Sequence, residues 1–160
     1  MNIQLGQYAG FCFGVDRAVN MVEEAAKAGG TVVTLGPIIH NHHVVDRFQR
    51  MGVEVANSPE EVRPGSTVVL RAHGVPRQVE ETLAGLPVQV VDATCPFVKR
   101  IHRLVQEAEA EGRTPVIIGT RTHPEVVGIA SWCRRGMVFE GPEELERWAA
   151  LPETSPGLPI

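Results

Sequence analysis

Short apolar runs and longer amphipathic runs alternate along this chain, with glycine and proline between them. The short runs are rich in β-branched residues, which favours strands, and the longer runs place apolar residues at helical spacing. This alternation predicts an α/β protein with parallel sheets. The predicted strands are 3–7, 31–35, 53–55, 67–71, 88–92, 116–118 and 137–139, and the predicted helices are 15–28, 41–51, 76–84, 96–111, 124–131 and 142–150, with a further helix start at 58–61.

The order of these elements predicts two successive βα arrays. We expect a first α/β domain over residues 1–95, with an N-terminal loop that carries Cys12, and a second, incomplete α/β domain over residues 96–151. Residues 152–160 show no periodicity and are rich in proline, which is typical of a linker.

Composition excludes several classes of protein. The chain has 160 residues, of which 43% are apolar, and a net charge of -4 without any block of like charge. These values suit a folded core and give no electrostatic support for binding to nucleic acid or to a membrane surface. The N-terminus lacks a signal-peptide pattern and no run is long enough to cross a bilayer, so we expect a cytoplasmic protein.

Common motifs are missing from the sequence. The three cysteines are far apart and odd in number, which fits neither a disulfide framework nor a CxxC motif. There is also no dinucleotide fingerprint, P-loop or nucleophile elbow.

Chemically unusual side chains come directly after predicted strands. In an open parallel sheet, the ligand crevice lies at this carboxyl edge. The residues concerned, in chain order, are Cys12, His40, Asn41, His73, Cys95, His123 and Glu125.

Cys12 and Cys95 each lie between a strand and a helix, where backbone amides and the helix dipole favour a thiolate. Such thiolates are good ligands for a metal or a cluster. The alternative is that each cysteine is a small buried hydrophobe. Cys133 lies between a helix and a strand, and we interpret it as an ordinary thiol.

His40, His73 and His123 could bind a phosphate through their ring N–H groups, with Arg71 and Arg121 close by in sequence. Each histidine taken alone has a structural interpretation as an alternative. Glu125 could carry protons, although an acid in the first turn of a helix is also favourable for the helix itself. His42, His43 and His102 fall on helical segments, and we interpret them as surface or packing residues.

Six segments of the chain together resemble the 4-hydroxy-3-methylbut-2-enyl diphosphate reductase (LytB) family. The segments are Gly10-Phe11-Cys12-Phe13-Gly14-Val15-Asp16-Arg17-Ala18, His40-Asn41, Val44-Val45-Asp46, Ala72-His73-Gly74-Val75, Asp92-Ala93-Thr94-Cys95-Pro96 and His123-Pro124-Glu125-Val126. They follow one another in order as far as about Pro142. The resemblance implies a trefoil of three similar α/β domains around a central [4Fe-4S] cluster, to which each domain supplies one cysteine.

The resemblance also implies roles for individual residues. Cys12 and Cys95 would be cluster ligands, and His40, Asn41, His73 and His123 would bind the substrate diphosphate, while Glu125, with His123, would relay protons. The implied activity is an oxidoreductase reaction in isoprene biosynthesis, which removes the allylic hydroxyl of the substrate to give isopentenyl and dimethylallyl diphosphates. A ferredoxin or flavodoxin would supply the electrons.

This chain is considerably shorter than members of that family, so we expect its third domain, with the third cysteine ligand, to be absent. Two alternatives remain open from the sequence. One is a non-catalytic α/β module that binds a diphosphate or assists assembly. The other is a zinc hydrolase with cysteine and histidine ligands, which the lack of local ligand spacing disfavours.

Overall fold

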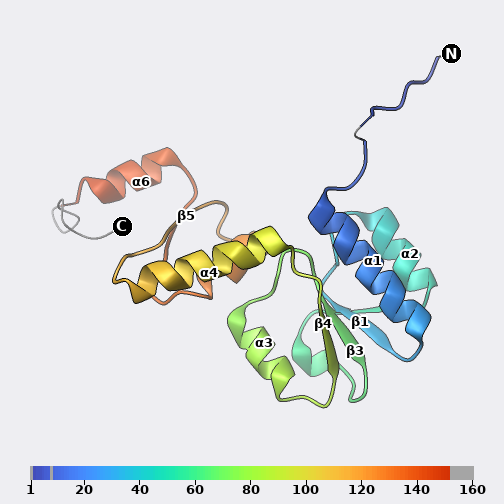
Figure 1. Cartoon of the computed structure of the whole chain (residues 1–160). Coiled ribbons are helices and arrows are strands. Elements are labelled where there is room, and N and C mark those ends of the chain that lie inside the picture. The colour runs from blue at the N-terminus through green and yellow to red at the C-terminus, as the bar shows by residue number, and fades with distance from the viewer. Residues whose placement is uncertain (1, 8, 152–160) are drawn as a thin grey trace.

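The computed structural model describes residues 2–7 and 9–151, and within them two parallel sheets form (Figure 1). The α/β class with parallel sheets is therefore confirmed. The elements are α1 (Phe13–Ala28), β1 (Val32–Leu35), α2 (His42–Arg50), β2 (Glu54–Ala56), the 3-10 turn η1 (Pro59–Glu61), β3 (Thr67–Leu70), α3 (Arg77–Ala84), β4 (Gln89–Asp92), α4 (Pro96–Ala110), β5 (Val116–Ile118), α5 (Pro124–Ala130), β6 (Met137–Phe139) and α6 (Pro142–Ala149).

The first sheet has the strand order β2-β1-β3-β4, and all its pairings are parallel. Successive residues of each strand face opposite sides, so the sheet buries apolar side chains on both faces. Val32 and Val69 pack with α1 and α2 on one face. Val33 and Val68 pack with α3 and the segment after η1 on the other face. This cover on both faces explains why the central strands are continuous runs of buried residues.

The connections that follow the two central strands, β1 and β3, lead to opposite edges of the sheet. After β1 it passes through α2 to β2 on one side, and after β3 it passes through α3 to β4 on the other side. The loops that follow β1 and β3 therefore separate at the carboxyl edge of the sheet, which is the place where open α/β sheets form a ligand crevice. His40 and His73 lie in these two loops.

The second sheet pairs β5 with β6 in parallel. Figure 1 shows α4 (yellow) running from the edge of the first sheet toward β5, so that this helix joins the two parts of the molecule. Val105 of α4 packs with Ile117 and Ile129 to form a separate small core.

The predicted strand at 3–7 is wrong. Residues 3–7 form no strand, and Ile3 and Leu5 are 79% and 90% exposed. Figure 1 shows this segment leading away from the rest of the fold, and no described strand pairs with it. An alternating apolar pattern predicts a strand only where a partner edge is available.

The other predicted elements are confirmed to within two residues at each end, except that the helix start at 58–61 makes only the single turn of η1. The predicted linker at 152–160 lies outside the described residues. Within the part of the chain that the structure covers, no helix is both long enough and apolar enough to cross a membrane.

Candidate functional site

Three imidazole rings from separate loops meet at the carboxyl edge of the first sheet. The ring centroids of His40 and His73 lie 4.4 Å apart, and the ring centroid of His123 lies 5.9 Å from each of the other two. His40 follows β1, His73 follows β3, and His123 is the N-cap residue of α5 in the second part of the fold. The structure thus brings together three predicted site residues that are 33 and 50 residues apart in the chain.

Backbone hydrogen bonds hold the loops of this edge in register. The Ala72 N–H donates to the Ile38 carbonyl over 3.2 Å, which joins the loop after β3 to the loop after β1. The Cys95 N–H donates to the Ala72 carbonyl over 2.9 Å, which joins the loop after β4 to the same place. The parallel ladder therefore continues beyond the strands, and it places Cys95 opposite the residue that precedes His73.

His73 is the most buried residue of the histidine cluster (His40, His73 and His123). Burial, aided by the nearby His40, Arg71 and His123, lowers the pKa of His73 to about 4. The ring is therefore neutral at pH 7, and its Nδ1 atom is buried without a hydrogen-bond partner among the described residues. A buried polar atom without a partner is uncommon and is typical of a site that a ligand completes.

A hydrogen bond fixes the orientation of the His123 ring. Its Nδ1 accepts a hydrogen bond from the Glu125 N–H over 3.2 Å, which caps the start of α5. The proton of the neutral ring is therefore on Nε2, which is free to donate to a ligand. Glu125 lies in the first turn of the same helix and is partly buried.

Asn41 and His40 come from the start of α2. The Asn41 Oδ1 accepts a hydrogen bond from the Val44 N–H over 3.3 Å, so this oxygen caps the helix. The cap leaves the amide NH₂ group of Asn41 as a donor, and His40 is exposed.

Arg71 adds a positive charge close to the cluster. Its Nε donates to the Gly74 carbonyl over 3.0 Å, and no described carboxylate forms an ion pair with it. Burial lowers the pKa of the Arg71 guanidinium, but its ordinary value is so high that it stays charged. A half-buried cation without a carboxylate partner favours an anionic ligand nearby.

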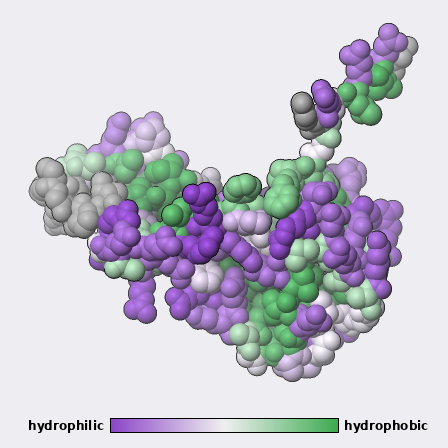
Figure 2. Space-filling view, in the orientation of Figure 1, coloured by the Kyte–Doolittle hydropathy of each residue, from purple (hydrophilic) through white to green (hydrophobic). Residues whose placement is uncertain are grey.

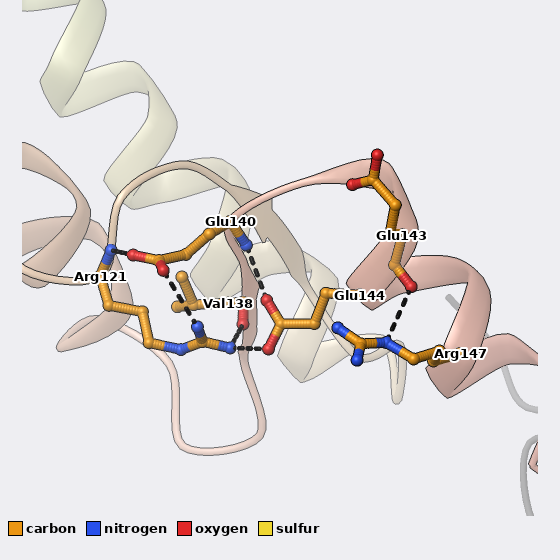
Figure 3. A network of polar contacts seen from close by, with 6 residues as sticks. All are labelled: Arg121, Val138, Glu140, Glu143, Glu144 and Arg147. Atoms are coloured by element: carbon orange, nitrogen blue, oxygen red, sulfur yellow. Dashed lines mark hydrogen bonds and ion pairs between the residues drawn. The ribbon is translucent and has the colours of Figure 1, made fainter.

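Arg121, which the sequence places two residues before His123, is engaged elsewhere. Its guanidinium forms ion pairs with Glu140 and Glu144, and it donates to the Val138 carbonyl over 2.9 Å. Figure 3 shows this network between the loop after β5 and the start of α6. Arg121 therefore fastens α6 to the second sheet and contributes its charge to two carboxylates.

Cys12 and Cys95 are the N-cap residues of α1 and α4. The expectation that both follow a strand is correct for Cys95, after β4, and wrong for Cys12, because residues 3–7 form no strand. Cys12 is exposed, Cys95 is partly buried, and neither forms a disulfide. A β-carbon on Gly14 would come within 2.5 Å of the Cys95 Sγ. The Cys95 thiol thus packs on the first turn of α1 at Gly14, which is two residues after Cys12 in the chain.

Arg17 ties the same two helix starts together. Its guanidinium donates to the Thr94 carbonyl over 3.2 Å and to the Asp92 carbonyl over 3.3 Å. These bonds reach from α1 to the loop that carries Cys95. The sequence shows no signal for this contact, since residues 17 and 94 are far apart in the chain.

Cys133 packs in a different part of the fold from Cys12 and Cys95. It belongs to the small core of the second sheet, and its thiol lies 3.7 Å from the Ala130 carbonyl. Burial raises the pKa of the Cys133 thiol. Among the described residues, no group of three or more histidine, cysteine, aspartate or glutamate side chains is arranged to hold a metal ion.

The interpretation of His102 as a packing residue is confirmed, but the sequence did not show what it packs against. His102 of α4 is 5% exposed and lies between the loop of His73 and α5. Its helical spacing from Val98 and Val105, which are both buried, is the signal that could have found it.

Together, these features define an α/β protein with parallel sheets, three histidines that meet at the carboxyl edge of the first sheet, and free cysteines at the starts of α1 and α4. Comparison with known proteins gives the family. The family model described as "LytB protein" matches residues 3–155, and the chain therefore belongs to the LytB family.

Relatives and solved structures agree with this assignment. The chain is 43% identical over 150 residues to the 4-hydroxy-3-methylbut-2-enyl diphosphate reductase of Aquifex aeolicus, covering 91% of this chain and 52% of that protein. It is 42% identical over 154 residues to the reductase of the same name from Solidesulfovibrio magneticus, covering 92% of this chain and 54% of that protein.

A solved structure of (E)-4-hydroxy-3-methyl-but-2-enyl diphosphate reductase matches with a TM-score of 0.79 at 43% identity, covering 91% of this chain and 53% of that one. The E-1-hydroxy-2-methyl-but-2-enyl-4-diphosphate reductase from Plasmodium falciparum matches with a TM-score of 0.85 at 28% identity, covering 88% and 45%. This chain spans about half the length of the relatives that it matches.

Proposed function

We propose that this chain is the N-terminal portion of an iron–sulfur reductase that acts on 4-hydroxy-3-methylbut-2-enyl diphosphate. The proposed reaction breaks the allylic C–O bond, consumes two electrons and two protons, and releases water with isopentenyl or dimethylallyl diphosphate. The observation that carries the proposal is the convergence of His40, His73 and His123 at the sheet edge that also holds Cys95.

The histidine cluster is the proposed site for the substrate diphosphate. His123 offers its Nε2–H, His40 offers an exposed ring, and His73 offers a buried nitrogen that has no partner among the described residues. Arg71 adds a fixed positive charge, and Asn41 retains two amide donors. This set provides charge-assisted hydrogen bonds to an anion without a strongly basic surface, which suits the net charge of -4.

Cys12 and Cys95 are the proposed cluster ligands in this portion. They fit the role because both are free thiols at helix N-termini, and because Arg17 and the Gly14 contact hold the two helix starts together. A bound [4Fe-4S] cluster with an open iron position would supply single electrons and a Lewis acid for the leaving hydroxyl. We assign the remaining cysteine ligand to the part of the relatives that this chain does not span.

Glu125 is the proposed proton carrier. It lies in the first turn of α5, two residues after His123, and its own N–H donates to the ring of that histidine. This arrangement puts a carboxyl group on the same helix start as a diphosphate donor. The proposed task of Glu125 is to hold a proton for the hydroxyl end of the substrate while His123 holds the diphosphate end.

The proposed partners and location follow from the chemistry. A ferredoxin or a flavodoxin is the proposed electron donor, because the reaction needs electrons delivered one at a time. The cytoplasm is the proposed compartment, since all three cysteines are free and a reducing environment keeps thiols available as ligands.

We propose that the chain divides into two α/β domains between residues 95 and 96, and that a third domain packs against them. Exposed apolar side chains support it. Phe97, Ile101 and Leu104 form a stripe on α4 with exposed fractions of 67%, 37% and 50%. Phe11 and Phe13 are also exposed, and Figure 2 shows hydrophobic atoms on the surface over the start of α1. Such patches are typical of surfaces that another segment covers.

A non-catalytic diphosphate-binding module is the second candidate. The histidine cluster is complete within this chain, whereas only two of the proposed cluster ligands belong to it. The second candidate therefore binds a diphosphate without a stable cluster.

Iron and acid-labile sulfide per chain, measured after anaerobic reconstitution, test the proposal. We expect the unmodified chain and Cys133→Ser to bind both, and Cys12→Ser and Cys95→Ser to lose most of them. Equal amounts of bound iron in all four proteins would show that Cys12 and Cys95 are not cluster ligands. Pyrophosphate binding without iron would favour the second candidate.

A further inference from the structure

His102 of α4 is a buried polar side chain that the proposed mechanism does not use. It is 5% exposed, and its Nε2 atom has no hydrogen-bond partner among the described residues. The indole ring of Trp132 stacks on the imidazole ring with 5.3 Å between centroids and 21° between planes. The ring therefore has one face fixed by an aromatic contact, which limits its movement.

The edge of the His102 ring contacts the loop that carries His73. A β-carbon on Gly74 would lie 3.1 Å from the His102 Cε1 and 3.2 Å from the Thr94 Cγ2. Gly74 also has a φ of 75°, a conformation that favours glycine. The backbone next to His73 is therefore seated directly on the His102 ring, at a distance that leaves no room for a side chain.

The Nε2 atom of His102 lies beside α5, the helix whose N-cap residue is His123. The position of a β-carbon on Gly128 lies 3.8 Å from the His102 Nε2, 3.8 Å from the His73 carbonyl oxygen and 3.9 Å from the Val75 carbonyl oxygen. These three polar atoms thus share one small space beside α5. The two carbonyl oxygens are acceptors only, so a nitrogen that lies near the same point is suited to carry a proton.

We propose that His102 is a positioning residue that sets the placement of His73 relative to His123. The inference rests on the proposed role of these two histidines in diphosphate binding. The His102 Nε2–H donates through one buried water toward the carbonyl oxygens of the His73 loop, while the ring supports Gly74 on one side and faces Gly128 on the other. His102 belongs to α4, the helix that joins the two sheets, so this ring couples the loop after β3 to α5.

The ring is suited to this role in its neutral form. Burial lowers the pKa of His102, with Lys99 acting in the same direction and Asp92 opposing it. A neutral ring has a single N–H, and acceptors reached through a bridging water would favour the tautomer that carries it on Nε2.

The experiment uses the full chain with labelled histidine side chains and inorganic pyrophosphate as the probe. His102→Phe keeps a ring against Trp132 but removes the N–H, and His102→Gln places an amide N–H at a similar reach. His42→Phe is the matched control, because His42 is an exposed residue on α2. Pyrophosphate affinity and the NMR cross-peaks between the His73 and His123 ring protons are measured for each protein.

We expect His102→Phe to weaken pyrophosphate binding by roughly tenfold, as for the loss of one net hydrogen bond. The same variant should lose the cross-peaks between His73 and His123. His102→Gln should retain most of both, and His42→Phe should match the unmodified chain.

A folded His102→Phe variant with unchanged affinity and unchanged cross-peaks would overturn the inference. So would a folded His102→Gln variant that loses the cross-peaks, and this second variant decides the matter if His102→Phe does not fold. Absence of pyrophosphate binding in the unmodified chain would instead contradict the proposed function. The cross-peaks of the ligand-free chain would then still test His102.

Discussion

The imidazole rings of His40 and His73 lie 4.4 Å apart, centroid to centroid, although β1 and β3 deliver them from separate loops. Two imidazoles at this distance cannot both be protonated without mutual repulsion. The pKa of His73 is lowered, because His73 is the more buried of the two and also lies near His40 and Arg71. A bound anion would relieve the repulsion, so this contact connects fold stability, pH and ligand binding.

The first prediction concerns the pH dependence of stability. The pKa of His73 falls from 6.5 to about 4 on folding, so the unfolded chain binds more protons between these two values. Its contribution to stability is complete above pH 6.5 and is lost as the pH falls toward 4. The full shift would correspond to about 3 kcal/mol, which we reduce to roughly 1–2 kcal/mol for partial solvent screening.

Urea unfolding of the chain and of His73→Gln at pH 7 and pH 5 measures this effect. The variant should lose less stability than the unmodified chain over that interval. His42→Gln serves as an exposed control and should behave like the unmodified chain. Equal losses in all three proteins would show that His73 does not carry the pH dependence.

The second prediction concerns Arg71. Its half-buried guanidinium has no carboxylate ion-pair partner among the described residues and lies close enough to His73 to affect that ring. Arg71→Met should weaken pyrophosphate binding by about tenfold, the effect of one charge-assisted interaction, and should raise the pKa of His73. Isothermal titration calorimetry and histidine NMR measure the two effects.

Arg121→Met is the matched control for Arg71, because the Arg121 guanidinium is engaged with Glu140 and Glu144 (Figure 3). Its pyrophosphate affinity should stay close to that of the unmodified chain. If both variants lose affinity equally, the effect of Arg71 comes from general charge and not from its position.

The third prediction concerns Gly14. A β-carbon there would come within 2.5 Å of the Cys95 Sγ and 3.1 Å of the Cys95 Cβ, so Gly14→Ala should force the starts of α1 and α4 apart. We expect a loss of about 1–3 kcal/mol in the free energy of unfolding, as for overpacking in other cores. Iron binding after reconstitution should fall as well.

Gly85→Ala is a suitable control for Gly14→Ala. The nearest atom to its added β-carbon is the Thr82 carbonyl oxygen at 3.5 Å, an ordinary contact. The double variant Gly14→Ala with Cys95→Ala removes the thiol from the clash and should recover part of the lost stability. Additive losses in the double variant would indicate that the two residues do not interact.

The fourth prediction concerns the apolar stripe of Phe97, Ile101 and Leu104 on α4. This chain alone should self-associate as its concentration rises, since the stripe remains in contact with water. Leu104→Glu should reduce that association, while Arg100→Glu, an exposed polar position on the same helix, should reduce it less. Sedimentation velocity over a range of concentrations measures the association. Identical profiles for the two variants would show that the stripe is not the surface through which the chain self-associates.

Much of the fold could be predicted from local pattern. The valine-rich runs 67–71 and 88–92 become β3 and β4 because β-branched side chains suit a buried pleated surface. The run at 3–7 has a similar pattern but forms no strand, because a strand needs a paired neighbour and the pattern does not supply one. The periodicity of α4 likewise places His102 on its buried face, but it does not show that the ring meets Gly74 and Gly128.

The sequence by itself determined the parallel α/β class, the order of the elements from α1 onward and the position of the active side chains after strands, with the exception of Cys12, because these features depend largely on neighbours within a few residues. Only the tertiary structure decided which loops meet. The packing of β1 beside β3, and of α4 against α5, brings His40, His73 and His123 together and sets Cys95 on Gly14. Such contacts arise from the burial of both sheet faces and from hydrogen bonds between distant loops, and no local pattern encodes their distances.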